Sequence, residues 1–210
     1  MPLHLLTGPL NSGKTTALLD ALKASLPAQA GLLVVPDRRT AAEFRRHLLA
    51  DTGDGLPALR SEAILDWPAF VQKLADPRLP VLGCGQATLL VHRLLAELRP
   101  SSFGTARASL GLARQCSETI AALKRNGITP EKLELIVDDH GTAARRERDL
   151  LALYARYDEE LASLGLLDEA GLVGLAAARV RAREAPLLEG LAALLVDEFP
   201  RFAPCHIEGL

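Results

Sequence analysis

Short apolar runs alternate with stretches of helical periodicity in the first quarter of the chain. The run Leu3–Thr7 precedes a helical pattern over Lys14–Ser25. A second run, Gly31–Val35, precedes a helical pattern over Thr40–Leu49. This order of elements predicts a βαβ unit, with buried parallel strands covered by helices.

The pattern also predicts where the second helix begins and which side of the first helix is apolar. Thr40 and Glu43 fit a capping box at the start of the second helix. The apolar side of the first helix is expected to consist of Ala17, Leu18, Ala21 and Leu22.

The middle of the chain, residues 85–183, has almost no strand signal, and its pattern predicts a series of helices. The expected helices cover residues 86–98, 112–124, a stretch beginning at Thr129-Pro130-Glu131, 143–163 and 168–183. In the fourth of these, apolar residues recur at helical spacing, and Gly165 is expected to end the helix. Tyr154 and Tyr157 belong to this apolar stripe, so we expect them in the core. The strand pattern returns only at Leu191–Val196, and the middle is therefore predicted to be a helical insertion in an α/β frame.

A glycine-rich loop lies between the first predicted strand and the first predicted helix. Its sequence, GPLNSGKT, matches the P-loop pattern, in which backbone N–H groups and the start of the following helix hold phosphates. Lys14 is expected to reach the β- and γ-phosphates, and the Thr15 hydroxyl to bind Mg²⁺. The predicted ligand is ATP with Mg²⁺, and the expected nucleotide-binding residues are Gly8, Pro9, Leu10, Asn11, Ser12, Gly13, Lys14, Thr15 and Thr16.

A pair of acids follows the last apolar run. Asp197 and Glu198 come directly after Leu194-Leu195-Val196, where ligand sites form at the carboxyl ends of parallel strands. We expect Asp197 to hold the Mg²⁺ shell and Glu198 to orient or activate the attacking water. Lys14, Asp197 and Glu198 are thus the candidate catalytic residues, with Thr15 and Asp197 as the metal ligands.

Composition narrows the class of protein. The 210 residues carry a net charge of −2, so nucleic-acid binding would need local basic patches. Arg38, Arg39 and Thr40 are candidate contacts to nucleic-acid phosphates at a strand end, and residues 145–148 (RRER) are a weaker candidate. No apolar run approaches the roughly 20 residues that cross a bilayer, and the N-terminus does not resemble a signal peptide. We therefore expect a cytoplasmic protein without a membrane partner.

Several segments together resemble the N-terminal part of AddB, the second subunit of the bacterial AddAB helicase–nuclease, a relative of superfamily 1 helicases of the UvrD/Rep type. The generic segment is GPLNSGKTT, and the more specific ones are LLVVPDRRTAAEF, the helix with two tyrosines, and LLVDEFPRFAP. The resemblance runs from end to end of the chain with order and spacing kept.

The resemblance implies an architecture and a set of partners. The fold would be a RecA-like P-loop NTPase core with a parallel sheet, interrupted by a large all-helical, 1B-like insertion. The core would comprise residues 1–84 and 186–210, the insertion residues 85–185, and the chain would be a piece of a longer protein. The partners would be DNA, as single strands or duplex ends, and an AddA-like subunit. The activity would be ATP-dependent helicase and exonuclease action in double-strand-break resection and recombination.

Two alternatives stay open beside the ATPase interpretation. UvrD-type helicases have Gln and Asp where this chain has Pro200 and Arg201, which favours an ATP-binding scaffold without turnover. Glu198, in contrast, favours hydrolysis. The other alternative is a small P-loop kinase acting on a metabolite, which the long helical middle disfavours.

Overall fold

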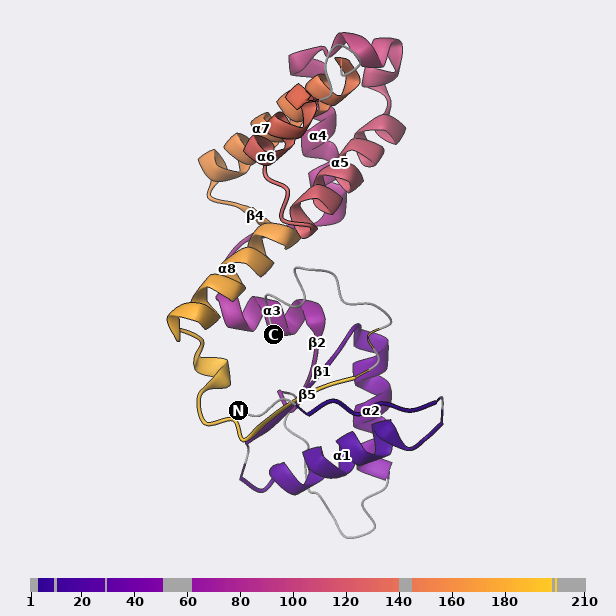
Figure 1. Ribbon diagram of the computed structural model, residues 1–210, viewed down its shortest axis with the longest axis vertical. Coiled ribbons are helices and arrows are strands. Elements are labelled where there is room, and N and C mark those ends of the chain that lie inside the picture. Colours follow the sequence, from indigo (N-terminus) through magenta and orange to yellow (C-terminus); the bar gives the residue numbers. More distant parts are fainter. Residues whose placement is uncertain are drawn as a thin grey trace. The chain divides into compact units, whose positions relative to one another are not determined.

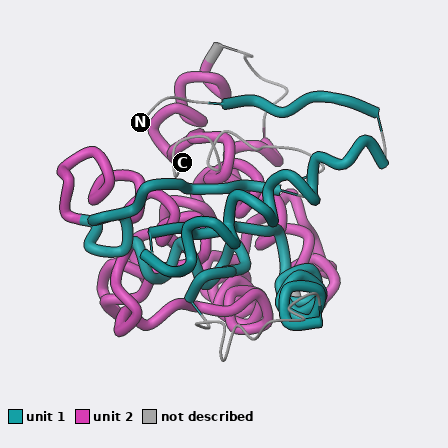
Figure 2. Tube along the Cα trace, turned by 90° about the horizontal axis from the view of Figure 1, so that it is seen from below, with its two compact units in different colours: residues 1–74, 185–201 teal, residues 75–184, 202–210 magenta. Residues whose placement is uncertain are grey.

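The computed structural model of the chain describes residues 4–9, 11–28, 30–50, 62–139, 145–197 and 199. The described residues group into two compact units, coloured separately in Figure 2. Unit 1 takes its residues from 1–74 and 185–201, and unit 2 from 75–184. The division at residues 84 and 185 expected from the sequence stays a prediction.

Unit 1 is built on a parallel sheet of three strands in the order β2-β1-β5 (Figure 1). β1 (Gly31–Val35) lies in the centre, with Leu33 opposite Ile64 of β2 (Ile64–Asp66) and Leu195 of β5 (Ala193–Val196). All five residues of β1 are buried, as a central strand covered on both faces requires. β1 and β5 confirm two of the predicted strands, and the α/β class with a small parallel sheet is confirmed.

Helices α1 (Lys14–Ser25) and α2 (Arg38–Ala50) cover one face of the sheet. Their buried side chains form a cluster with the strands that consists of Leu19, Leu22, Leu33, Val35, Ala41, Leu48 and Ile64. Ala17 and Ala21 are exposed, so the predicted apolar side of α1 was wrong in part. The helix instead turns its larger residue, Leu19, inward, because an isobutyl group removes more apolar area from water than a methyl group.

The predicted strand Leu3–Thr7 is wrong for its described residues. Residues 4–8 have no regular secondary structure, and Leu5 and Leu6 are 82% and 51% exposed. A strand needs a neighbour to satisfy its N–H and C=O groups. Within the described part of the chain β5 pairs only with β1, and residues 4–8 do not join the sheet. An apolar run alone therefore did not decide strand formation here.

The short strand β2 and the helix that follows it were not predicted. β2 has three residues, too few to show periodicity, and it leads directly into α3 (Trp67–Ala75). Asp66 ends the strand and caps the helix, since its Oδ1 accepts a hydrogen bond of 2.8 Å from the Ala69 N–H. The 3₁₀ turn η3 (Pro186–Leu188) precedes β5 in unit 1.

Unit 2 is mainly helical. It contains a two-residue parallel pair, β3 (Val81–Leu82) with β4 (Leu167–Asp168). Its helical elements are α4 (Cys84–Leu98), η1 (Ser101–Ala108), α5 (Leu110–Arg125), α6 (Pro130–Asp139), α7 (Arg145–Leu164) and α8 (Glu169–Ala182). Each predicted helix of the middle is present with ends shifted by a few residues.

The core of unit 2 lies among α4, α5 and α7. It includes Val91, Leu94, Leu95, Ile120, Leu153, Tyr154, Tyr157 and Leu161. The two tyrosines are nearly fully buried, which confirms their predicted place in the core. Gly165, with φ of 62°, ends α7, and its N–H donates to the Ala162 carbonyl.

Candidate functional site

The glycine-rich loop folds around the amine of Lys14. The Lys14 Nζ donates to the Gly8 carbonyl at 2.9 Å, to the Pro9 carbonyl at 2.7 Å and to the Ser12 Oγ at 3.1 Å. Gly13 has φ of 84°, a left-handed conformation that glycine adopts without steric cost. The loop therefore holds its lysine in a cage of oxygen atoms directly before α1.

Gly13 and Gly8 have particular places in this loop. Gly13 occupies the N-cap position of α1 and provides no side-chain acceptor for the first N–H groups of the helix. A Cβ atom at Gly8 would lie 2.7 Å from the Ser12 Oγ, so a side chain there would disturb the loop. Thr15 and Thr16 lie in the first turn of α1, and Leu10 is outside the described residues.

The loop lies at the carboxyl edge of the sheet. The end of α1 packs at the start of β1, where a Cβ at Gly31 would overlap the Ser25 side chain. A helix of 12 residues rises about 18 Å and a strand of five spans about 17 Å, so the start of α1 reaches the other end of the strands. Figure 1 shows α1 beginning at the side where β1 and β5 end.

Asp197 lies at the same edge. It follows β5, and its N–H donates to the Val34 carbonyl of β1 at 3.2 Å. The structure thus brings Lys14, Thr15 and Asp197 to one edge of unit 1. Glu198, the candidate for water activation, lies outside the described residues.

The candidate phosphate contacts after β1 are engaged within the protein. The Arg38 Nε lies 3.6 Å from the Asp66 Oδ2, and the Arg39 Nε lies 3.1 Å from the Glu43 Oε1. Both guanidinium groups remain exposed. The roles of Arg38, Arg39 and Thr40 at DNA stay predictions.

The predicted capping box at Thr40 and Glu43 is wrong, because the helix begins two residues earlier. The Asp37 Oδ1 accepts a hydrogen bond of 2.9 Å from the Thr40 N–H. This bond, together with the charge of Arg39, lowers the pKa of Asp37. Asp37 and Asp66 cap α2 and α3 at the same sheet edge. The sequence analysis missed both caps, although an aspartate directly before a helical pattern indicates one.

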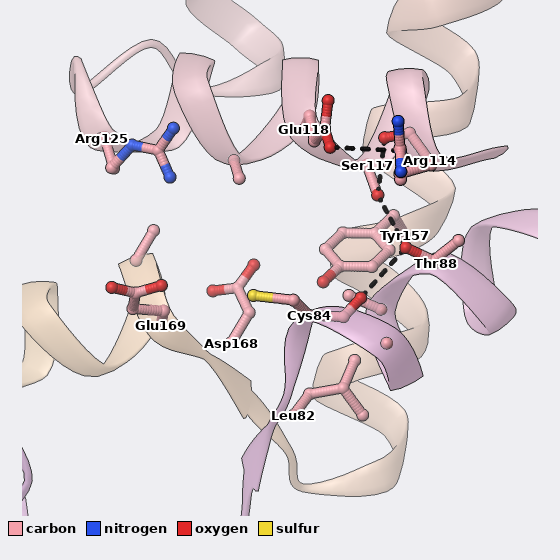
Figure 3. Close-up of a pocket in the computed structure, with 14 residues that line it drawn as sticks. Leu82, Cys84, Thr88, Arg114, Ser117, Glu118, Arg125, Tyr157, Asp168 and Glu169 are labelled. Atoms are coloured by element: carbon pink, nitrogen blue, oxygen red, sulfur yellow. Dashed lines mark hydrogen bonds and ion pairs between the residues drawn. The ribbon is translucent and has the colours of Figure 1, made fainter. Parts of the chain in front are cut away.

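Unit 2 contains a separate cavity of about 300 Å³ (Figure 3). Tyr157 and Asp168 lie at its wall, between the starts of α4 and α8. The Lys124 Nζ lies 2.7 Å from the Asp168 Oδ2 and 2.8 Å from the Asp158 Oδ1, and it stands 5.5 Å from the centre of the Tyr157 ring. Burial, followed by the charge of Asp168, raises the pKa of Tyr157. The buried charges beside this cavity are thus satisfied within the protein.

The described part of the chain contains no helix with the length and apolar character needed to cross a membrane. Two free thiols are present in this part, Cys84 on the surface and Cys116 in the core.

Comparison with known proteins gives consistent matches over nearly the whole chain. The chain is 28% identical to the B subunit of the ATP-dependent helicase/deoxyribonuclease of Moorella thermoacetica, and 28% identical to the protein of the same name from Bacillus pumilus. Each match covers 97% of this chain but only 19% and 18% of the respective relative, so the chain spans about a fifth of their length. The sequence model of the family described as "ADDB, N-terminal" matches residues 5–209, and the chain therefore belongs to the AddB N-terminal family.

Proposed function

We propose that this chain is the ATP-binding N-terminal part of a DNA-repair helicase–deoxyribonuclease subunit that acts in break resection and recombination. The observation that carries the proposal is the closed loop around Lys14, joined to a helix start that lacks a side-chain cap. Family membership and the names of the relatives support the DNA-processing context.

The loop fits a triphosphate on chemical grounds. The Lys14 amine makes all its bonds to two carbonyls and one hydroxyl, and phosphate oxygens are stronger acceptors because they are charged. An entering phosphate would exchange with these groups, while the N–H groups of the first turn of α1 supply further donors. Gly13, in its left-handed conformation, directly precedes those N–H groups at the start of α1.

A magnesium ion would be held between the loop and the sheet edge. In this arrangement the Thr15 hydroxyl and the Asp197 carboxylate would be the protein ligands, and Glu198 would orient the attacking water. Bound Mg²⁺ would neutralise charge that develops on the phosphates. The protein contributes the fixed edge of the sheet, because β5 is held in register with β1 through four residue pairs.

The same proposal includes the finer architecture and partners. Unit 1 would be part of a RecA-like core, unit 2 a 1B-like helical insertion, and the partners DNA and an AddA-like subunit. Two features support this assignment. The parallel sheet has a glycine-rich loop and the start of α1 at its carboxyl edge, and the helical unit comes between α3 and β5 in the sequence.

One observation favours a non-hydrolysing scaffold as the second candidate. The segment before the loop, residues 4–8, is exposed and has no strand partner within the described residues. A P-loop without an anchored strand holds its catalytic groups less rigidly, and catalysis loses more from misplacement than binding does.

Calorimetric titration with Mg-ATP tests the proposal. We expect the wild type to bind and Lys14→Ala to bind at least tenfold more weakly, which corresponds to about 1.4 kcal/mol or more. Lys23→Ala, which removes the same charge from the other end of α1, is the matched control and should keep wild-type affinity. Equal affinity of the two variants would contradict the proposal. Phosphate release from the wild type then separates the ATPase from the scaffold.

A further inference from the structure

Three arginines gather in the first turn of α7. Arg145, Arg146 and Arg148 are exposed, and none of them lies within ion-pair distance of an acid among the described residues. Many other cations of the described chain do have such partners. Exposed arginines pair with a glutamate four residues later on the same helix in Arg39–Glu43, Arg93–Glu97, Arg114–Glu118 and Arg156–Glu160.

The position of the three arginines is electrostatically unfavourable for the helix. The N-terminal end of a helix carries partial positive charge, so exposed cations there destabilise the helix. The arginines also repel one another. By comparison, Arg179 and Arg181 lie in the last turn of α8, where cations are favoured. Helix stability therefore explains the position of Arg179 and Arg181, but it does not explain the position of the three arginines at the start of α7.

Contacts around the cluster hold it in place without neutralising it. The Arg146 guanidinium lies over the Phe103 ring, 5.7 Å from its centre, at the edge of a cavity of about 500 Å³. The nearest downstream acid on the helix, Asp149, accepts hydrogen bonds from the Ser102 N–H and Oγ at 2.9 and 2.6 Å. Glu147 is the only other acid in this turn, so the turn keeps a net positive charge.

We propose that the start of α7 binds backbone phosphates of a nucleic acid. The inference rests on the proposed function for the identity of the polyanion. Guanidinium groups match phosphate oxygens with paired hydrogen bonds, and an arginine stacked on a ring is oriented before it binds. The chain as a whole carries a net charge of −2, so attraction of a polyanion requires a local surface of this kind.

Fluorescence anisotropy with labelled single-stranded and duplex DNA tests the inference on the 210-residue chain. The variant is Arg145→Gln/Arg146→Gln/Arg148→Gln, and the observable is the slope of log affinity against log salt concentration. Loss of three phosphate contacts should make the slope shallower by about 2 for single strands and about 2.7 for duplex. At 0.1 M salt the single-strand affinity should fall about a hundredfold, since the salt term vanishes only near 1 M.

The matched control changes the same charge at the other end of a helix in the same unit. Arg179→Gln/Arg181→Gln/Arg183→Gln should keep the wild-type slope. The inference would be overturned if the α7 variant kept the wild-type slope, or if both variants lost affinity equally. It would also be overturned if the wild type did not bind DNA, or if millimolar inorganic phosphate displaced the DNA at constant ionic strength. Mg-ATP titration of the α7 variant separates failure of the DNA-binding inference from failure of the proposed function, because the substitutions in α7 should leave ATP binding at the loop unaffected. Circular dichroism spectra identical to the wild type establish that the variants are folded.

Discussion

Replacement of Lys124 by methionine tests the buried charge network of unit 2. The lysine side chain is 14% exposed and that of Asp168 is 11% exposed, so removal of the cation leaves a carboxylate with little access to water. Asp158, with a side chain 33% exposed, recovers part of its hydration. Breaking a buried ion pair from one side costs about 3–5 kcal/mol, and the partial exposure of Asp158 places our expectation at about 3 kcal/mol.

The chain offers separate optical probes for its two units. Its single tryptophan, Trp67, belongs to unit 1, and both tyrosines, Tyr154 and Tyr157, belong to unit 2. In urea unfolding, we expect Lys124→Met to lower the midpoint of the tyrosine transition by about 1.5 M, for a slope of about 2 kcal/mol per M. The tryptophan transition should shift less.

The pH dependence of the same variant gives a second measurement. Burial raises the pKa of Asp158, and its hydrogen bond and charge interaction with Lys124 act in the opposite direction. Without Lys124 the folded-state pKa rises further above the ordinary value of 3.8, and the folded state binds the proton more tightly than the unfolded state. The destabilisation should therefore be largest at neutral pH and shrink as pH falls through the raised pKa.

A control variant separates the network from a general effect of losing a lysine. Lys132→Met removes an exposed lysine of the same unit whose Nζ donates, among the described residues, only to the Gly127 carbonyl. This change should alter stability by about 0.5 kcal/mol or less. If Lys124→Met is no less stable than this control, or if its destabilisation grows in acid, the ion-pair reasoning is refuted.

Two further substitutions test local contacts. Asp66→Ala should destabilise unit 1 by about 1–2 kcal/mol through loss of the cap on α3, while Asp66→Asn should recover most of it; tryptophan fluorescence in urea measures both, and equal loss in the two variants would contradict the cap. Tyr154→Phe should cost about 1 kcal/mol because the Ile128 carbonyl loses the hydrogen bond that the Tyr154 hydroxyl donates at 2.9 Å. Chemical unfolding followed by far-UV circular dichroism measures this change, and a variant as stable as the wild type would show that water replaces the hydroxyl.

Local sequence was sufficient where the deciding interactions are local. Thr129 precedes α6 and its Oγ accepts from the Lys132 N–H, as the predicted helix start requires. Gly165 ends α7 through bonds within the same turn. The loop between Gly8 and Lys14 likewise makes its closing contacts to itself, so its pattern could be found without the fold. β1 and β5 were also found, because each is a continuous apolar run, as is usual for strands of a parallel sheet; β1 is buried and β5 is half-buried.

Tertiary structure alone decided the questions that depend on distant neighbours. The apolar run before the loop does not form a strand, although its composition resembles that of β5, and its described residues pair with neither edge of the sheet. Which elements meet also decides the pairing order β2-β1-β5 and the turn of Leu19 toward the sheet. The same holds for the lack of ion pairs at the arginines of α7 among the described residues. Sequence determines contacts within a turn or a loop, since the chain itself fixes those distances, whereas contacts between elements exist only after packing brings residues far apart in the chain together.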